Sequence, residues 1–155
     1  MRIWHKSLIP ALPREQLVAQ WRECSAIAGN ILKLGNPNHI LVNKIMDYPL
    51  THFISYSIMI RDEMTKRGYK TMNSVMEKIE SLLPFEQLEF IDKKTLFADW
   101  HNANYLRQCY YNLEEKYDCG GIKKEDMQRI SAACVCQDPR VDIKDGFYPI
   151  FCWEV

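Results

Sequence analysis

Several features that would assign a protein to a familiar class are missing from this 155-residue sequence. It contains no run of about 18 apolar residues, so no segment is expected to cross a membrane. Its six glycines form no phosphate-binding loop, and neither an internal repeat nor a Ser-His-Asp spacing is visible. These absences argue against membrane, nucleotide-binding, repeat and serine hydrolase proteins, while a hydrophobic fraction of 47% argues against disorder.

The start of the chain does not resemble a secretion signal, because Lys6, Arg14 and Arg22 interrupt any apolar stretch. We therefore expect a cytoplasmic protein, in which the six cysteines stay reduced. A chain of this length is most simply one domain, residues 1–155, and is long enough to bury a core.

The cysteines lack the CxxC pairs that make a metal site convincing. A metal site could be drawn from Cys134-x-Cys136 together with His101, Cys109 and Cys119, but the spacing does not favour it. Most of the cysteines are instead expected to be small buried hydrophobic residues. Neither a metal nor any other cofactor is expected.

The net charge is zero, which excludes a protein that binds nucleic acid through overall positive charge. The charge is unevenly divided, however, since residues 1–70 hold ten Lys and Arg against five Asp and Glu, whereas residues 71–155 hold ten against fifteen. Affinity for DNA depends on local positive surface, so the first part of the chain remains a candidate for DNA binding, with strong salt sensitivity.

Residues 12–29 have the pattern of one helix. Pro13 suits its first position, Gly29 suits the position just past its end, and a stripe of apolar residues recurs at helical spacing: Leu17, Trp21, Cys24 and Ala28. Glu23 lies off this stripe, and none of its neighbours three or four residues away is a cation. Arg22 and Glu23 are consistent with an ordinary solvated pair on a surface helix, or with a site where Glu23 stays available for chemistry.

Two stretches, taken in order, match a recognisable pattern. The first is an RI pair near the start followed by LxxxxLxAxxRE, and its residues are Arg2-Ile3, Leu12, Leu17, Ala19, Trp21 and Arg22-Glu23. The second is Glu63-Met64-Thr65-Lys66-Arg67-Gly68-Tyr69, a Lys-Arg-Gly-aromatic run after an acidic residue at a helix end. Together they resemble the pyrimidine-dimer DNA glycosylase family over residues 1–70.

The resemblance implies a small all-helical DNA repair enzyme that acts on double-stranded, ultraviolet-damaged DNA without a cofactor. It implies that the amine of the N-terminal residue, here Met1, attacks the sugar carbon of the 5′ pyrimidine and releases the base. An imine then forms, and β-elimination breaks the strand. It further implies that Glu23 is the essential carboxylate, and that Arg2 and Arg22 lie at the DNA surface. A monomer is expected.

The chemistry of these groups agrees with the implied roles. An α-amino group has a reference pKa of about 8, so roughly a tenth of it is neutral at pH 7, whereas a lysine near 10.4 is far less available. A neutral amine can form a covalent imine, which divides one difficult step into two easier ones. A carboxylate such as Glu23 can stabilise positive charge on the sugar or move protons during elimination.

Three positions qualify the resemblance. Arg2 is too large to favour methionine removal, so Met1 is expected to be retained with its amine in the nucleophile position. The family pattern has an arginine where this chain has Ala26, and a histidine where it has Gln16. Zero net charge and Ala26 favour an alternative, a noncatalytic nucleic-acid-binding relative or a helical protein-interaction module.

The remaining sequence predicts an all-α domain of five or six helices, with the N-terminal segment lying across the first helix. Helices are expected at residues 39–47, 49–67, 74–83, 95–116 and 126–134. Ser74 and Glu77 suggest a capping box, and the polar start at residues 99–104 suggests either a cleft lining or a capped helix start. His52 is expected to be partly buried rather than at DNA. The aromatic residues 146–153 are expected to pack on the domain.

Overall fold

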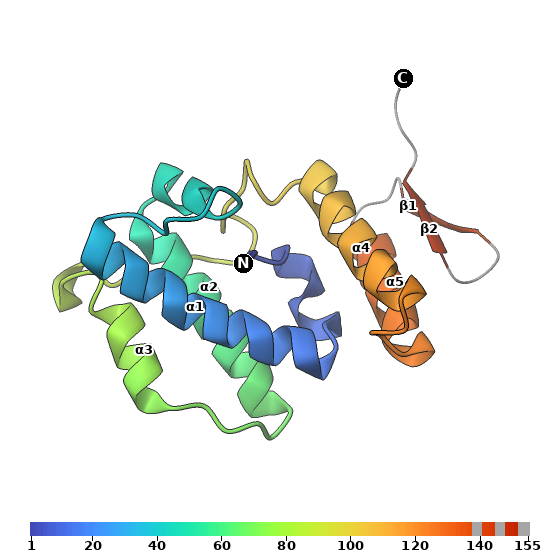
Figure 1. Cartoon of the computed structure of the whole chain (residues 1–155). Coiled ribbons are helices and arrows are strands. Elements are labelled where there is room, and N and C mark those ends of the chain that lie inside the picture. The colour runs from blue at the N-terminus through green and yellow to red at the C-terminus, as the bar shows by residue number, and fades with distance from the viewer. Residues whose placement is uncertain (138–140, 145–147, 152–155) are drawn as a thin grey trace. The chain divides into compact units, whose positions relative to one another are not determined.

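The computed structural model describes residues 1–137, 141–144 and 148–151, with side chains described through residue 134. Its elements are mainly helical (Figure 1), and five α-helices lie within the described residues: α1 Arg14–Leu34, α2 Leu50–Lys66, α3 Asn73–Glu80, α4 Ala103–Asp118 and α5 Lys124–Gln137. Short 3-10 helices and a strand pair complete them: η1 Lys6–Ala11, η2 Asn43–Asp47, η3 Phe85–Gln87, β1 Val141–Lys144 and β2 Tyr148–Phe151. The predicted helical class is confirmed. The antiparallel hairpin of β1 and β2 was not predicted.

The chain divides into two compact units. The first comprises Met1–Ile3 and Arg14–Ala98, and the second comprises Trp4–Pro13 and Asp99–Val155. Whether the whole chain unfolds as one domain, as the sequence suggests, stays a prediction. Both motifs of the sequence lie in the first unit, apart from Leu12. The first unit is therefore the part of the molecule in which a site is to be sought.

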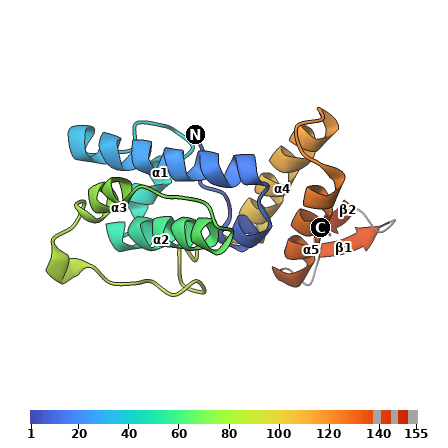
Figure 2. The same cartoon turned by 90° about the horizontal axis from the view of Figure 1, so that it is seen from below.

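In the first unit, α1, α2 and α3 contact one another, and α1 and α2 run in opposite directions (Figures 1 and 2). Their apolar faces meet in a core that excludes water, with fully buried side chains at Leu17, Ile27, Phe53, Ile60 and Ile79. Burial of apolar surface contributes about 25 cal/mol per Å² to folding, so this three-helix contact is the main source of order in the unit.

The first helix begins at Arg14, two residues after the start of the predicted span 12–29, and it does not end at Gly29. Pro13 directly precedes α1, and the helix continues five residues past Gly29 to Leu34. The predicted end was wrong because Ile31, which is 8% exposed, adds another buried position after the glycine. The helix ends instead at Gly35, which has φ +76°, a backbone conformation that favours glycine, and donates its N–H to the Ile31 carbonyl at 2.9 Å.

Gly29 is therefore a glycine inside a helix, and a Cβ atom added to it would meet no atom within 4 Å. Replacing it by alanine is expected to raise the free energy of unfolding by about 0.5–1 kcal/mol, because glycine loses more backbone entropy on helix formation. Urea unfolding followed by circular dichroism measures this change. A lower free energy of unfolding in Gly29→Ala would show that the added methyl group meets another part of the protein.

The second helix matches its prediction within one residue at each end. Pro49 precedes α2, and Gly68 follows its end with φ +77°. The core-facing side chains of the helix include Phe53, Ile60 and Met64, which are buried. His52 is half-buried, and its Nδ1 accepts the Phe97 N–H at 3.0 Å, which agrees with the expected partly buried side chain.

The third helix differs from its predicted span 74–83 at both ends, since α3 ends three residues earlier, at Glu80. α3 begins at Asn73, and its N-cap is Met72, which makes no side-chain hydrogen bond to the helix. The predicted capping box of Ser74 and Glu77 is therefore wrong, because both residues already lie inside the helix. Asn73 Oδ1 accepts a hydrogen bond from Arg61 of α2 at 2.9 Å, a tertiary contact at the point where the helix begins.

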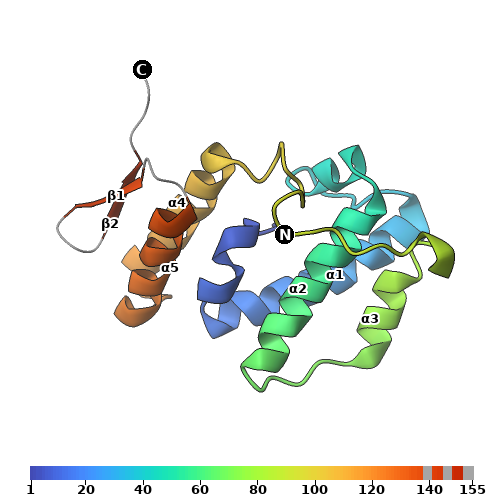
Figure 3. The ribbon, with the colours of Figure 1, turned by 180° about the vertical axis from the view of Figure 1, so that it is seen from behind.

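In the second unit, α4 and α5 lie side by side (Figure 3). The predicted helical start at Thr95 was wrong, since Phe97 has φ +47°, and α4 begins at Ala103. Asn102 caps it by accepting the Tyr105 N–H at 3.0 Å, which confirms the capped start among the two alternatives.

Other boundaries are shifted by a few residues. α5 starts two residues earlier and ends three residues later than the predicted helix 126–134, and only residues 43–47 of the predicted helix 39–47 are helical, as η2. Part of the aromatic segment 146–153, including its last two residues, lies outside the described residues, so its packing stays a prediction.

Three cysteines are buried as expected, Cys24, Cys109 and Cys134, while Cys119 is exposed. Within the described part of the chain, no three His, Cys, Asp or Glu side chains gather around a possible metal position. The side chain of Cys136 and the whole of Cys152 lie outside that part. None of the described helices combines the length and the apolar character needed to cross a bilayer.

Candidate functional site

The start of the chain lies beside Glu23 of α1. The Met1 nitrogen is 3.8 Å from Glu23 Oε1, and the Arg2 N–H donates a hydrogen bond to Glu23 Oε2 at 2.9 Å. The side chains of Met1 and Glu23 are 20% and 30% exposed, so both are partly open to a ligand. The arrangement brings one amine and one carboxylate together at the surface of the first unit.

A pair at this exposure adds little to folding. Partly solvated ion pairs contribute about 0–1 kcal/mol, because water screens the charges and ordering the side chains costs entropy. The proximity of the amine and Glu23 is therefore not explained by a gain in stability. An amine that loses its proton becomes a nucleophile, and a carboxylate next to it can hold that proton or stabilise a cation.

Two buried residues, Ile3 and Gln20, hold the N-terminal segment next to the Met1–Glu23 pair. Ile3 is fully buried and anchors the segment, while the side chain of Gln20 donates from Nε2 to the Arg2 carbonyl at 2.9 Å. The Gln20 Oε1 in turn accepts the hydroxyl of Tyr56 at 3.2 Å. The amide thus links α1, α2 and the terminal segment at one point, next to Glu23.

Cys24 follows Glu23 in the sequence, but it is no competing nucleophile. Burial raises the pKa of its thiol to about 12, an effect that hydrogen bonds from Ser57 and Gln20 only partly oppose. The thiolate, not the thiol, is the reactive form of cysteine. At neutral pH the site therefore presents the amine and the carboxylate as its reactive groups, and Cys24 serves as a packed core residue.

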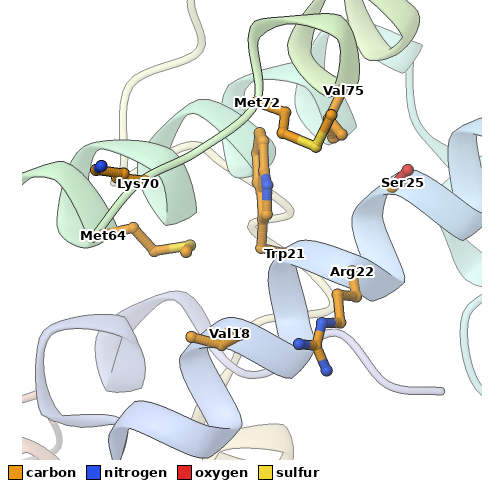
Figure 4. Close-up of a pocket in the computed structure, with 8 residues that line it drawn as sticks. All are labelled: Val18, Trp21, Arg22, Ser25, Met64, Lys70, Met72 and Val75. Atoms are coloured by element: carbon orange, nitrogen blue, oxygen red, sulfur yellow. The ribbon is translucent and has the colours of Figure 1, made fainter.

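A cavity of about 340 Å³ lies in the first unit, between α1, α2 and the start of α3 (Figure 4). Most of its lining is apolar and comes from Val18, Trp21, Met64, Met72 and Val75. Its polar lining includes Arg22, directly before Glu23 in the chain, and Lys70 of the loop after α2. In Figure 4 the Trp21 ring extends toward Met72, whereas the Arg22 side chain points away from it.

Cations border this cavity from more than one element. Arg22 and Lys70 are exposed, and Lys78 of α3 donates from Nζ to Ser25 Oγ at 2.5 Å. Ala26 is exposed and supplies no charge. Local positive charge on this surface therefore comes from Arg22, the loop and α3, despite the neutral sum over the chain.

The second motif lies at the end of α2, where its residues make structural contacts. Arg67 pairs with Glu63 at 2.7 Å, one helical turn away, and the guanidinium of Arg14 lies 5.5 Å from the centre of the Tyr69 ring. These contacts tie the helix end and the following loop to the start of α1. The motif thus shapes the loop that carries Lys70 rather than supplying a reactive group itself.

The sequence analysis did not single out Gln20 or Tyr56. Both are fully buried polar side chains, and their contact joins residues 36 positions apart. The sequence offers little indication of their role. Gln20 lies three residues before Glu23 and beside the apolar stripe, and a solvent-exposed glutamine could occupy the same position in the sequence. Arg2 and Arg22 lie in the same segments as Met1 and Glu23, and their contact with DNA stays a prediction.

The geometry is that of a small helical protein in which the chain start meets a glutamate of the first helix. The same helix also lines a cavity that has Arg22 and Lys70 at its edge. Residues 1–77 match the model of the family described as pyrimidine dimer DNA glycosylase, which supports the family that the sequence motifs suggested. The matched residues include both sequence motifs, Met1, Glu23 and the residues that line the cavity, while Lys78 lies just outside the match. No curated protein and no solved structure gave a significant match to the chain.

Proposed function

We propose that this protein is a pyrimidine-dimer DNA glycosylase with AP lyase activity, in which the Met1 amine is the nucleophile and Glu23 the essential carboxylate. The observation that carries the proposal is the 3.8 Å distance between the Met1 nitrogen and Glu23 Oε1. The substrate is duplex DNA with an ultraviolet lesion, and the chemistry requires no metal and no organic cofactor. The cytoplasmic location and the monomeric state remain predictions.

In the first step, the neutral amine attacks C1′ of the 5′ pyrimidine nucleotide. The N–C1′ bond forms while the bond from C1′ to the base breaks, and the base leaves with the electron pair and takes up a proton. Loss of the amine proton and opening of the sugar ring then leave an imine between Met1 and C1′. Glu23 is placed to stabilise the developing positive charge and to accept or return these protons.

In the second step, a base removes a proton from C2′ of the imine. The imine takes up the electron pair as an enamine, and the pair then forms a C2′=C3′ double bond as the 3′ phosphate leaves with the C3′–O bonding electrons, so the strand is cut. Water finally hydrolyses the imine and restores the amine. Glu23 is the carboxylate within reach of the terminus for proton removal, and it is the group on which both steps converge.

Access to C1′ requires a distorted duplex, because stacked bases screen this carbon. Extruding a nucleotide costs a few kcal/mol and is cheapest where damage has already weakened pairing. Arg2 and Arg22 would hold phosphates, with Lys70 as a further cation beside the cavity. Such a site recognises the lesion through the deformability of the DNA rather than through its charge.

The test is incubation of the protein with abasic-site DNA and borohydride, which reduces the imine to a stable covalent adduct. A trapped adduct on Met1, together with strand cleavage at a pyrimidine dimer, is the expected result. DNA binding without any adduct would instead identify the noncatalytic relative that zero net charge and Ala26 favour.

The DNA surface is tested by salt dependence. Arg22→Ala and Lys70→Ala are each expected to weaken binding to damaged DNA and to make the plot of log affinity against log salt shallower by about 0.9, the value for one phosphate contact. Lys33→Ala is the matched control, because Lys33 lies in the last turn of α1, about 16 Å along the helix from Arg22. Unchanged slopes in Arg22→Ala and Lys70→Ala would place the DNA elsewhere.

A further inference from the structure

We propose that Gln20 and Tyr56 are positioning residues that hold the Met1 amine in reach of the sugar carbon. This inference rests on the proposed function, since it assigns a cause to the position of the nucleophile. Neither residue needs to touch the substrate. They act through the backbone of Arg2, whose carbonyl accepts the Gln20 amide at 2.9 Å.

The burial of the two side chains indicates a specific role. Gln20 and Tyr56 are both fully buried, and a buried polar group that lacks a partner costs about 1–3 kcal/mol. Each named atom here has a partner: Gln20 Nε2 donates to the Arg2 carbonyl, and Gln20 Oε1 accepts from the Tyr56 hydroxyl. An apolar residue at position 20 would pack equally well without the cost of removing a polar group from water. The presence of an amide at this buried position is therefore explained by the hydrogen bonds that it makes.

The geometry explains how the contact fixes the amine. The carbonyl of Arg2 is bound by Gln20 and its N–H by Glu23 Oε2 at 2.9 Å, so the residue is held at both ends of its backbone. Only the Cα and carbonyl carbon of Met1 separate the Met1 nitrogen from that fixed N–H. The amine can therefore move mainly by rotation within Met1, and it stays near Glu23.

Chain ends are otherwise poorly ordered unless other contacts hold them. Release of the Arg2 carbonyl would let the amine sample positions far from the reacting carbon, and a displacement of about 1 Å can cost on the order of a hundredfold in rate. The Tyr56 hydroxyl contributes by orienting the amide, because it binds Oε1 and leaves Nε2 to face Arg2. Its loss should cost less than the loss of the amide itself.

The experiment measures the rate of borohydride-trapped adduct formation at saturating abasic-site DNA, together with DNA affinity and thermal unfolding. Gln20→Met keeps the length of the side chain and removes both hydrogen bonds; we expect a rate loss of about 10–100-fold. Tyr56→Phe should lose about 3–10-fold for the same reason, with unchanged DNA affinity in both variants. Tyr110→Phe is the matched control, because Tyr110 is also fully buried but lies in α4, and its adduct rate should stay at the wild-type value.

A pH profile of Gln20→Glu separates positioning from a merely structural role. The introduced carboxyl still accepts the Tyr56 hydroxyl, but it can donate to the Arg2 carbonyl only when protonated. Burial raises the pKa of a carboxyl, so the protonated form persists in the acidic range. The rate relative to wild type should therefore be highest at low pH and fall as the introduced carboxyl ionises, and a ratio that is flat between about pH 5 and 8 would overturn the inference.

The outcomes distinguish the two proposals. If wild type forms a Met1 adduct and both Gln20→Met and Tyr56→Phe trap as fast, the positioning role is wrong while the enzyme assignment stands. If wild type forms no adduct, the proposed function fails, and this inference fails with it. If Gln20→Met does not fold by circular dichroism, the milder Tyr56→Phe and the profile of Gln20→Glu decide.

Discussion

Replacing Glu23 by glutamine is expected to abolish base release while the protein remains folded. The substitution keeps the shape of the side chain and removes its charge and its capacity to accept a proton. Acid–base groups contribute about 10²–10⁴-fold to rate, so a loss of at least about a hundredfold is expected on duplex DNA with a pyrimidine dimer. Stability should change little, because a partly exposed ion pair such as that of Glu23 with the Met1 amine contributes about 0–1 kcal/mol.

Binding to damaged DNA should persist or improve in Glu23→Gln, since a negative charge leaves the surface that faces phosphates. Glu15→Gln is the matched control: it makes the same change in the first turn of α1, about 12 Å along the helix from Glu23. Single-turnover release of the base measures both variants. Wild-type rates in Glu23→Gln would remove this carboxylate from the mechanism, whatever the activity of the protein.

Blocking the terminus is expected to have an effect as large as the loss of Glu23. Acetylation of Met1 removes both the charge and the nucleophilic lone pair of the amine. A tag that leaves extra residues moves the amine by about 3.3 Å for each extended residue, and it separates the new amine from Glu23. Since about 1 Å of displacement can cost on the order of a hundredfold, an N-terminally tagged protein should form no borohydride-trapped adduct.

A C-terminally tagged protein serves as the control and should form the adduct at the full rate. Mass spectrometry of this protein is expected to show that Met1 is retained, and the trapped peptide should begin with Met1. A trapped lysine within the chain, or full activity with the N-terminal tag in place, would contradict the mechanism even if the protein repaired DNA. A lysine starts from a reference pKa of about 10.4, which makes it the weaker candidate at neutral pH.

The two blocking experiments also separate the roles within the site. Glu23→Gln should retain the Arg2 N–H contact through its remaining oxygen, so the amine stays close and slow imine formation at an abasic site can persist. Tagging removes the amine from the site altogether, so no imine forms on any substrate. A Glu23→Gln protein that still traps at abasic DNA but releases no base would assign Glu23 mainly to the glycosylase step.

Much of the helical fold followed from the sequence alone, because it depends on local properties. The periodic apolar residues around Trp21 predicted the first helix, and Pro13 and Gly68 marked boundaries through their fixed or unusual backbone angles. A backbone preference of this kind acts within a few residues and does not need the rest of the chain. The pairing of the chain-terminal amine with Glu23 was expected on a different ground, since the resemblance to the glycosylase family implied it.

Tertiary packing overrode the local preferences of the sequence at two helix boundaries. The sequence predicted that the first helix ends at Gly29, but the helix extends to Leu34 because Ile31 is buried. It also favoured a cap at Ser74, whereas the helix begins at Asn73, which binds Arg61 of another helix. Local preferences of this kind amount to about 0.5–1 kcal/mol each, and one buried aliphatic side chain contributes about 1.5–3 kcal/mol.

The hydrogen bonds that hold the N-terminal segment could not be predicted from the sequence either. The contact of Tyr56 with Gln20 joins two helices across 36 positions, and the bond from Gln20 to the Arg2 carbonyl spans 18. A glutamine in a helix and a tyrosine in another have no local signature that distinguishes this contact from solvent exposure. The sequence therefore determined which groups can react, through their chemistry, while only the packing of α1 on α2 decided what holds the amine next to Glu23, because a buried hydrogen bond exists only where the fold brings its two partners together.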